Sequence, residues 1–293
     1  MRDRLRTCSQ PQLLGPAAAV AVWVACLVAR PGVFAQEKQP GKPTDEKAEL
    51  AEFLDEARHY TIRATKPEAV LKLHEPPVLN FTNPERNQER GSVFVWVHEG
   101  RPAVMGQFFR FDVQERRPKK HALHSLMDVP LEATFHDRVA WTPEQPGVEW
   151  KSFPDAPAVA ATHNERLLQM RQLARRFKVD LIDPRDKVTE LRLAPRPLFE
   201  YSAPKAGVTD GAIFSFFVAT DPEAILLVEA FDGRGKAGFR YAFARFHFWR
   251  LTARVGDRTV WDVEHDPVMN GNRFANPAAM KKVYNSYHAE LGK

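Results

Sequence analysis

The chain has 293 residues, of which 44% are apolar, 27% charged and 11% aromatic. A chain with this much apolar side chain is not disordered, and its 23 prolines exclude a long coiled coil. At ~150 residues per domain, the length predicts about two domains, each large enough to bury a core.

Residues 1–35 have the pattern of a signal peptide. Arginines near the start precede an apolar stretch at residues 13–29, and small residues stand at both cleavage-selecting positions up to Ala35. We therefore predict cleavage after Ala35, a linker at residues 36–44, and an exported protein, periplasmic or secreted, with no membrane span after cleavage. Two alternatives stay open: a retained membrane anchor, for which the stretch is short of the ~20 residues of a span, and a lipid-modified Cys26.

Removal of the leader changes the charge of the chain. The leader holds four of the 42 basic and one of the 37 acidic residues, so the mature chain has 38 and 36 and a net charge of +2. A nearly neutral chain has no electrostatic reason to bind nucleic acid. Both cysteines, Cys8 and Cys26, lie in the leader. The mature chain is therefore expected to have no disulfide, no cysteine-ligated metal and no cysteine nucleophile.

The sequence matches itself at an offset of 120 residues. The segment Pro77-Val-Leu-Asn-Phe81 aligns with Pro197-Leu-Phe-Glu-Tyr201, and the same offset places Gly91 on Gly211 and Trp141 on Trp261. Residues 71–142 have 15 identities in 72 positions at this offset, without a gap. We interpret the match as an internal duplication.

Each repeat is predicted to begin with a helix. Residues 45–60 and 164–178 both carry apolar side chains at the i, i+3, i+4, i+7 spacing of an amphipathic helix. Thr162 and Glu165 precede the second helix with the spacing of a capping box. A third helix is predicted after Pro277, where apolar residues again follow a helical spacing.

Strands are predicted to follow the helix in each repeat. Residues 92–97 and 103–111 are rich in β-branched and aromatic side chains, as are their counterparts 212–219 and 224–231. Short turns such as Gly256-Asp257 join neighbouring strands, which must then be antiparallel.

These elements predict an α+β protein: two tandem copies of a helix packed on an antiparallel β-sheet, plus a C-terminal helix. The expected boundaries after the linker are a first repeat at 45–142, a Pro-rich connector at 143–161, a second repeat at 162–263, and a C-terminal tail and helix at 264–293. Duplicated domains commonly pack about a pseudo-two-fold axis, and the groove between them is then a natural place for a ligand.

Three polar side chains are candidates for catalysis: His124, Glu229 and Arg245. Glu229 interrupts an apolar run and falls opposite Arg240 in the expected hairpin, so it is either half of a structural ion pair or a group that grips a ligand or acts as a base. His124 lies three residues after His121, and in a strand this odd separation places the two on opposite faces, which argues against a shared metal.

The glycines of Gly233-Arg-Gly235-Lys-Ala-Gly238 have the spacing of a dinucleotide loop. Such a loop must follow a strand and open a helix, whereas these glycines join two expected strands. We therefore predict no cofactor and no metal.

Four segments, 91–102, 121–126, 191–201 and 210–223, resemble exported proteins common in planctomycete bacteria. Examples are Gly91-Ser-Val-Phe-Val-Trp-Val-His-Glu-Gly-Arg-Pro102 and the run from Asp210 to Glu223. The members of that family are uncharacterised, so the resemblance implies export and transfers no functional residue.

The leading functional hypothesis is an exported, non-enzymatic binding or structural module with an unknown envelope or extracellular partner. Residues kept in both repeats are mainly glycine, proline, tryptophan and aliphatic side chains, which build a scaffold. The alternative is a hydrolase with a site between the repeats that uses Glu229 or His124. A third hypothesis is sugar binding through Trp96 or Trp249, which requires solvent-facing rings.

Overall fold

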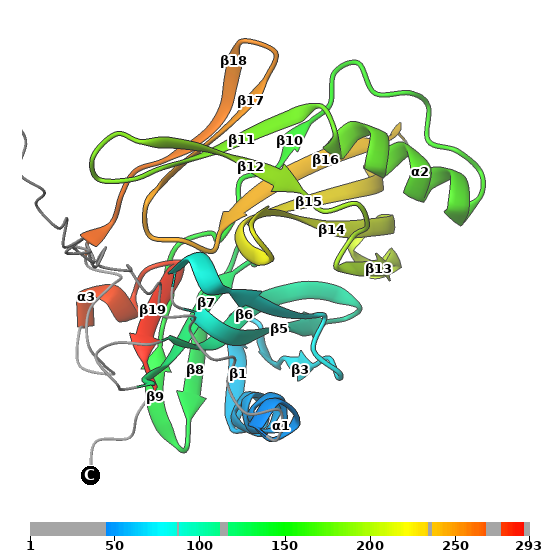
Figure 1. Cartoon of the computed structure of the whole chain (residues 1–293). Coiled ribbons are helices and arrows are strands. Elements are labelled where there is room, and N and C mark those ends of the chain that lie inside the picture. Colours follow the sequence, from blue (N-terminus) through cyan, green and yellow to red (C-terminus); the bar gives the residue numbers. More distant parts are fainter. Residues whose placement is uncertain (1–44, 87, 112–116, 234–235, 268–276, 290–293) are drawn as a thin grey trace, which may run out of the picture. The chain divides into compact units, whose positions relative to one another are not determined.

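The computed structural model describes residues 45–86, 88–111, 117–233, 236–267 and 277–289 (Figure 1). The expected signal peptide and linker, residues 1–44, lie outside this part of the chain.

The first half of the chain contains one α-helix, a short 3-10 helix and nine strands among its described residues. In chain order these are α1 (Asp45–Arg58), β1 (Tyr60–Thr65), β2 (Glu68–Val70), β3 (Lys72–Leu73), β4 (Leu79–Asn83), η1 (Pro84–Arg86), β5 (Gln88–His98), β6 (Arg101–Phe111), β7 (Lys119–Ser125), β8 (Leu131–Phe135) and β9 (Arg138–Trp141).

The second half has the same order of elements, except that the single strand β12 spans the positions of β2 and β3. After β10 (Lys151–Ser152) come α2 (His163–Ala174), β11 (Phe177–Ile182), β12 (Val188–Leu193), β13 (Phe199–Ala203), η2 (Pro204–Ala206), β14 (Val208–Val218), β15 (Asp221–Gly233), β16 (Lys236–Arg245), β17 (Arg250–Val255) and β18 (Arg258–Val263). The chain then forms α3 (Pro277–Met280) and β19 (Tyr284–His288).

Strands dominate this architecture, so the predicted α+β class of two helix-on-sheet copies is wrong. The strands form sheets in the orders β2-β1-β8-β9, β19-β7-β6-β5-β3 and β10-β16-β15-β14-β12-β11-β17-β18, with β4 on β5 and β13 on β14. All of the strand pairs are antiparallel. The prediction of antiparallel sheet is confirmed. The class failed because strands far outnumber helices: the sheets have four, six and nine strands, while each half has one long helix among its described residues.

The predicted C-terminal helix is also wrong. Among the described residues 277–289 only the four of α3 are helical, and β19 instead pairs with β7, with Tyr284 opposite His124. Tyr284 packs in the core shared by the two halves and Tyr287 in the core of the first half, so both faces of β19 are buried. A strand buried on both faces has no polar alternation, and its apolar residues can then imitate a helical period.

Strand pairing in the two halves has the same register at an offset of 120 residues. Phe81 lies opposite Gly91, and Tyr201 lies opposite Gly211. The irregularity in the β5–β6 pair between Trp96 and Val97 recurs between Phe216 and Phe217 in the β14–β15 pair. The two halves therefore agree in element order, in register and in the positions of their bulges.

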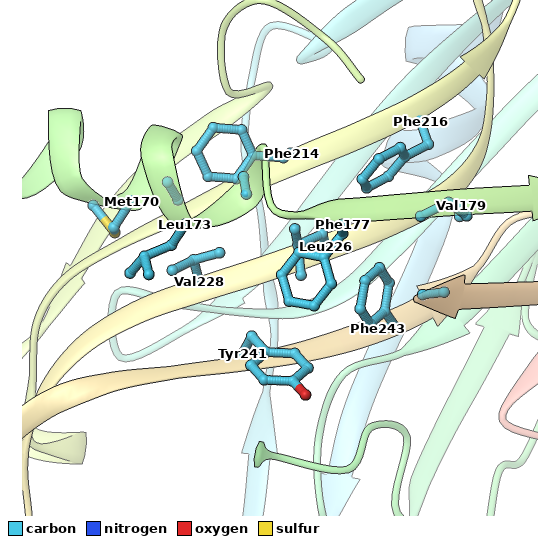
Figure 2. Packing of buried hydrophobic residues seen from close by; sticks show 14 of the residues in the cluster. Met170, Leu173, Phe177, Val179, Phe214, Phe216, Leu226, Val228, Tyr241 and Phe243 are labelled. Carbon is cyan, nitrogen blue, oxygen red and sulfur yellow. The ribbon is translucent and has the colours of Figure 1, made fainter. Parts of the chain in front are cut away.

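Helix α2 begins and packs as its sequence predicts. The capping box is present, since the Thr162 side chain accepts from the Glu165 N–H and the Glu165 side chain accepts from the Thr162 N–H. The buried residues of the helix are Leu167, Met170, Leu173 and Ala174. Figure 2 shows Met170 and Leu173 beside Val228 of β15, in the core of the second half. Burial of each such large apolar side chain is worth ~1.5–3 kcal/mol.

A third core contains residues of both halves. Val93, Val95 and Met105 of the first half pack in it with Ile213 and Ile225 of the second. The neighbouring residues along β5, such as Phe94, point to the other face and pack in the core of the first half. The two halves thus share an apolar contact, and the candidate site lies beside it.

Contacts between the halves are reciprocal. The Thr220 hydroxyl donates to the Thr82 carbonyl at 2.5 Å. At the positions equivalent by the offset, Gly100 and Ser202 also meet, because a Cβ on Gly100 would fall 2.6 Å from the Ser202 carbonyl oxygen. Such an exchange of equivalent partners is typical of segments related by a two-fold axis.

Candidate functional site

A partly open cavity of about 340 Å³ lies where residues of the two halves meet. Its buried wall carries Gln107, Phe109, Lys120, Asp221, Glu223, Phe246, Tyr284 and Ser286, and its partly exposed rim carries Arg86, Phe111, His247, Phe248 and Trp249. The cavity combines aromatic rings with buried polar and charged groups that can orient a ligand, as small-molecule sites do.

Strand alternation places the polar groups in the wall. Gln107 and Phe109 are two residues apart on β6 and so lie on one face of that strand. Asp221 and Glu223 also line the cavity from the start of β15, where the irregularity in the pairing with β14 falls at Glu223. Lys120 lies opposite Phe109 in the β6–β7 pair. The cavity therefore draws its lining from strands that are far apart in the sequence.

The two carboxyl groups that β15 places in the cavity, Asp221 and Glu223, are bound by residues of the first half. Asp221 accepts from the Gln107 amide at 2.6 Å and from the Asn83 amide at 3.0 Å. Glu223 accepts from the Arg86 guanidinium at 2.6 Å. Burial and the neighbouring charge of Asp221 outweigh Arg86 and raise the pKa of Glu223 well above its usual range. Glu223 therefore keeps its proton to a higher pH than an exposed carboxyl.

Lys120 contributes a buried amino group to the cavity wall. Its side chain extends among aromatic rings, with Nζ 5.5 Å from the centre of the Phe248 ring and 6.0 Å from that of Phe111. The residue is only 5% exposed, and burial lowers the pKa of the ammonium to about 8. A large fraction of Lys120 is thus a neutral amine in mildly alkaline solution.

His247 contributes a neutral imidazole to the rim. Its Nδ1 accepts the Trp249 backbone N–H at 3.0 Å, which requires an unprotonated nitrogen. Burial, together with the nearby cations Arg86, Arg245 and Lys120, lowers the pKa of His247 well below its usual range. The Arg86 guanidinium lies 5.4 Å from the centre of the Trp249 ring.

The equivalent positions on the other side of the contact are filled by an ion-pair cluster. Phe109, Lys120 and Asp221 of the cavity correspond at the 120-residue offset to Glu229, Arg240 and Arg101. Glu229, fully buried, accepts from Arg101 at 2.8 Å, from Arg240 at 2.7 Å and from the Tyr201 hydroxyl at 2.9 Å. The Trp150 ring covers both guanidinium groups, at 4.8 and 4.7 Å. One side of the contact is thus packed with charge, while the other holds a cavity.

The three candidate residues from the sequence do not line this cavity. Glu229 belongs to the ion-pair cluster and lies opposite Arg240, as the expected hairpin required. His124 is buried, shares a hydrogen bond of 3.1 Å with the Gly147 carbonyl, and has its pKa lowered to about 4 by burial. Arg245 donates to the carbonyls of His247, Glu264 and Trp249 at 2.7–3.0 Å. Arg245 therefore supports the rim of the cavity from behind.

A buried polar network escaped the sequence analysis. His121 Nε2 lies 2.9 Å from a Glu56 carboxylate oxygen, and its Nδ1 lies 2.8 Å from the Tyr60 hydroxyl, which also bonds to the Tyr287 hydroxyl. Burial opposes ionisation of Glu56, but the hydrogen bonds from His121 and Lys119 outweigh burial and lower its pKa. The network is enclosed in the core of the first half, where it satisfies buried polar groups. A signal existed in the i, i+4 pair Glu52 and Glu56, since the two acids lie on one face of the helix and attract basic partners there.

The structure also places the histidine pair, the glycine-rich segment and the two tryptophans that the sequence singled out. His121 and His124 point to opposite faces of β7, toward Glu56 and Gly147 respectively, and the described residues contain no cluster of three or more metal-ligating side chains. Gly233 pairs with Lys236 across the β15–β16 hairpin, so the glycine-rich segment joins two strands and opens no helix. Trp96 is 1% exposed, which removes it as a sugar platform, whereas Trp249 stays on the cavity rim.

Within the part of the chain that the structure describes, no helix has the length and apolar character needed to cross a membrane. Comparison of the chain with protein-family models, with curated proteins and with solved structures gives no match.

Proposed function

We propose that the protein is an exported, non-enzymatic binding module that holds a small, largely apolar ligand in the cavity between its halves. The observation that carries the proposal is the cavity itself, whose rim includes the rings of Phe248 and Trp249. Its volume falls at the lower end of the ~300–1,000 Å³ of small-molecule sites.

The two sides of the contact between the halves differ, and this difference supports a cavity that is retained for ligand binding. The residues on the two sides of the contact occupy equivalent positions at the 120-residue offset. On one side, Glu229 and its arginine partners fill the space that is a cavity on the other side. The side with Lys120 keeps its space open although open apolar space costs stability. A ligand that occupies the cavity accounts for that cost.

The hydrolase alternative needed Glu229 or His124 at a site between the repeats. Glu229 is neutralised by two arginines, and the pKa of His124 is lowered to about 4, so its imidazole is not tuned for proton transfer near neutral pH. We therefore favour binding over hydrolysis.

The same proposal includes three further points: export, the internal duplication, and the resemblance to planctomycete-type exported proteins. The basic start, apolar stretch and small residues of the first 35 positions support export. The shared strand register of the two halves supports the duplication. A periplasmic or extracellular location would bring the cavity to envelope components, among which we place the partner.

Binding of N-phenyl-1-naphthylamine, an uncharged aromatic dye, to the mature chain tests the proposal. Ser286→Phe introduces a ring at the buried Ser286 of the cavity wall and is expected to weaken dye binding at least tenfold, whereas Ser286→Ala keeps the space and the affinity. Circular dichroism establishes that both variants are folded. Equal dye affinity of Ser286→Phe and wild type would show that the dye binds elsewhere and would remove the proposal.

A further inference from the structure

We propose that the ligand of the cavity is an apolar carboxylate, whose charged group binds the Arg86 guanidinium while its apolar body lies against the aromatic rings of the lining. The inference rests on the proposed function, because the acid must enter the same cavity, and it adds the chemical class of the ligand.

The guanidinium of Arg86 is the first argument. Arg86 lines the cavity, and among the described residues its only hydrogen bond runs from Nη1 to Glu223, at 2.6 Å. The side chain is 22% exposed, and neither Nε nor Nη2 is both buried and without a partner. These nitrogens are therefore open to a ligand. The planar guanidinium offers paired N–H donors that match the two oxygens of a carboxylate.

Two neighbours hold the guanidinium in position. Glu223 is 1% exposed and accepts from one end of Arg86, and the Trp249 ring centre lies 5.4 Å from the guanidinium carbon. A side chain that is already held in place loses little conformational freedom when a ligand binds to it. Arg86 is thus a preorganised binding group at the edge of the cavity.

The charges around the cavity favour an anion over a cation. Burial lowers the pKa of His247 on the rim, and nearby charges, among them those of Arg86 and Arg245, lower it further. Glu223 keeps its proton because burial and the charge of Asp221 raise its pKa, so it does not neutralise Arg86 near neutral pH. A cationic ligand would meet the repulsion that acts on His247, whereas a carboxylate would be attracted.

Asp221 favours a ligand with a single negative charge. It lines the same wall, and the amides of Gln107 and Asn83 donate to its carboxylate. Hydrogen bonds to a carboxylate stabilise its charged form. A dianionic phosphate would bring a second charge toward this carboxylate, whereas a carboxylate ligand brings one charge to one guanidinium. The class that fits is therefore a monoanionic acid.

The binding group and its neighbours are specific to the cavity side of the contact. At the 120-residue offset, the arginine, the acid that binds it and the tryptophan beside it correspond to Ala206, Ala103 and Val129. The other side thus has no arginine, acid or ring at these positions. The arrangement is therefore not a by-product of the fold that the two halves share.

Three naphthyl probes that differ in charge test the inference on the mature protein at pH 7. They are 1-naphthoate, the neutral 1-naphthamide and the cationic 1-naphthylmethylamine, and calorimetric titration gives the affinity of each. Naphthoate is expected to bind more tightly than naphthamide by about tenfold or more, and the amine to bind most weakly. This order is measured on the wild-type chain and does not depend on a variant.

Arginine variants then test the role of Arg86. Arg86→Met should lower the ratio of naphthoate to naphthamide affinity by about tenfold or more. Arg86→Lys, which keeps the charge but lacks the paired donors, should lower the ratio by a smaller factor. Arg196→Met removes an exposed arginine that does not line the cavity and should leave the ratio unchanged. Circular dichroism establishes that the variants are folded.

The outcomes separate the two proposals. Equal affinity for naphthoate and naphthamide, in protein that binds the uncharged dye, would overturn the carboxylate class and leave the binding function. Tighter binding of 1-naphthyl phosphate than of naphthoate would also overturn that class. A preference for naphthoate that neither Arg86 variant reduces would overturn the role of Arg86. Failure of the dye and of all three naphthyl probes to bind would remove both proposals.

Discussion

Lys120 and Glu229 show how the surroundings of a buried charged residue decide whether its charge stabilises or destabilises the fold. Both side chains are buried within strands near the contact between the halves. Glu229 accepts hydrogen bonds from two guanidinium groups and a hydroxyl, whereas burial lowers the pKa of Lys120, whose Nζ lies beside the Phe111 and Phe248 rings. Burial of a charge costs free energy unless partners compensate. The structure therefore predicts opposite effects when each charge is removed.

Replacement Lys120→Met should stabilise the protein at pH 7. The folded pKa of about 8 lies below the unfolded value near 10.5, so the unfolded chain binds more protons between these values and stability rises with pH there. Removal of the amine should raise the free energy of unfolding by up to about 3 kcal/mol at pH 7, and the gain should vanish near pH 11. Urea unfolding at both pH values measures this, with Lys205→Met as the surface control. A loss of stability at pH 7 would show that Lys120 is stabilised by its surroundings.

Replacement Glu229→Gln should destabilise the protein. It leaves Arg101 and Arg240 close together without the carboxylate that both contact. Breaking a buried ion pair by removal of one partner costs about 3–5 kcal/mol. Guanidinium chloride unfolding of wild type and variant gives the difference. A change below about 1 kcal/mol would show that solvent already screens the cluster.

At the scale of elements, glycine permits the close packing of an aromatic ring over a neighbouring strand. The Phe81 ring lies over Gly91, and the Tyr201 ring lies over Gly211, in equivalent strand pairs. A Cβ on Gly211 would fall 2.2 Å from the Tyr201 ring, closer than any real contact. The ring position matters because the Tyr201 hydroxyl bonds to Glu229.

Replacement Gly211→Ala should therefore cost about 1–3 kcal/mol, the usual price of overpacking. Gly238 provides the matched control, since it also lies in a strand but a Cβ there would meet Phe231 at an ordinary 3.7 Å. Gly238→Ala should leave the stability unchanged or slightly raised. Thermal unfolding of the two variants compares them directly. Equal thermal unfolding midpoints for the two variants would mean that the Tyr201 ring moves aside at no cost in stability.

At the scale of the whole described chain, the halves are joined by a shared core. Residues such as Val95 and Ile213 belong to that core, and Arg86 of one half bonds to Glu223 of the other. Separation of the halves would expose these apolar side chains to water, at ~25 cal/mol per Å². The halves should therefore unfold together.

Calorimetry of the mature chain should show one transition with equal calorimetric and van't Hoff enthalpies. Leu226→Ala, in the core of the second half, should lower stability by about 2–5 kcal/mol. Amide hydrogen exchange should then also accelerate in β5 of the first half, because the slowest amides of both halves exchange through the same global unfolding. Two transitions, or acceleration confined to the second half, would show that the halves unfold separately.

Much of the local structure was predictable because it depends on neighbours in sequence. The capping box of Thr162 and Glu165 and the placement of Glu229 opposite Arg240 follow from short-range geometry. The cavity was not predictable, since Lys120, Glu223 and Tyr284 come from strands β7, β15 and β19 and meet only through tertiary packing. In the sequence, Lys120 is simply the counterpart of Arg240 at the 120-residue offset, and no local pattern distinguishes Glu223.

The sequence alone determined the antiparallel strands, the helix α2 and the 120-residue correspondence, because local periodicity, turns and repeated residues are written along the chain. Only the tertiary structure decided that the residues after α3 form strand β19, that one side of the contact is filled and the other open, and that Lys120 is buried among rings. The physical reason is that burial, and with it the pKa of a buried group, depends on which distant strands pack together, and no local pattern encodes that choice.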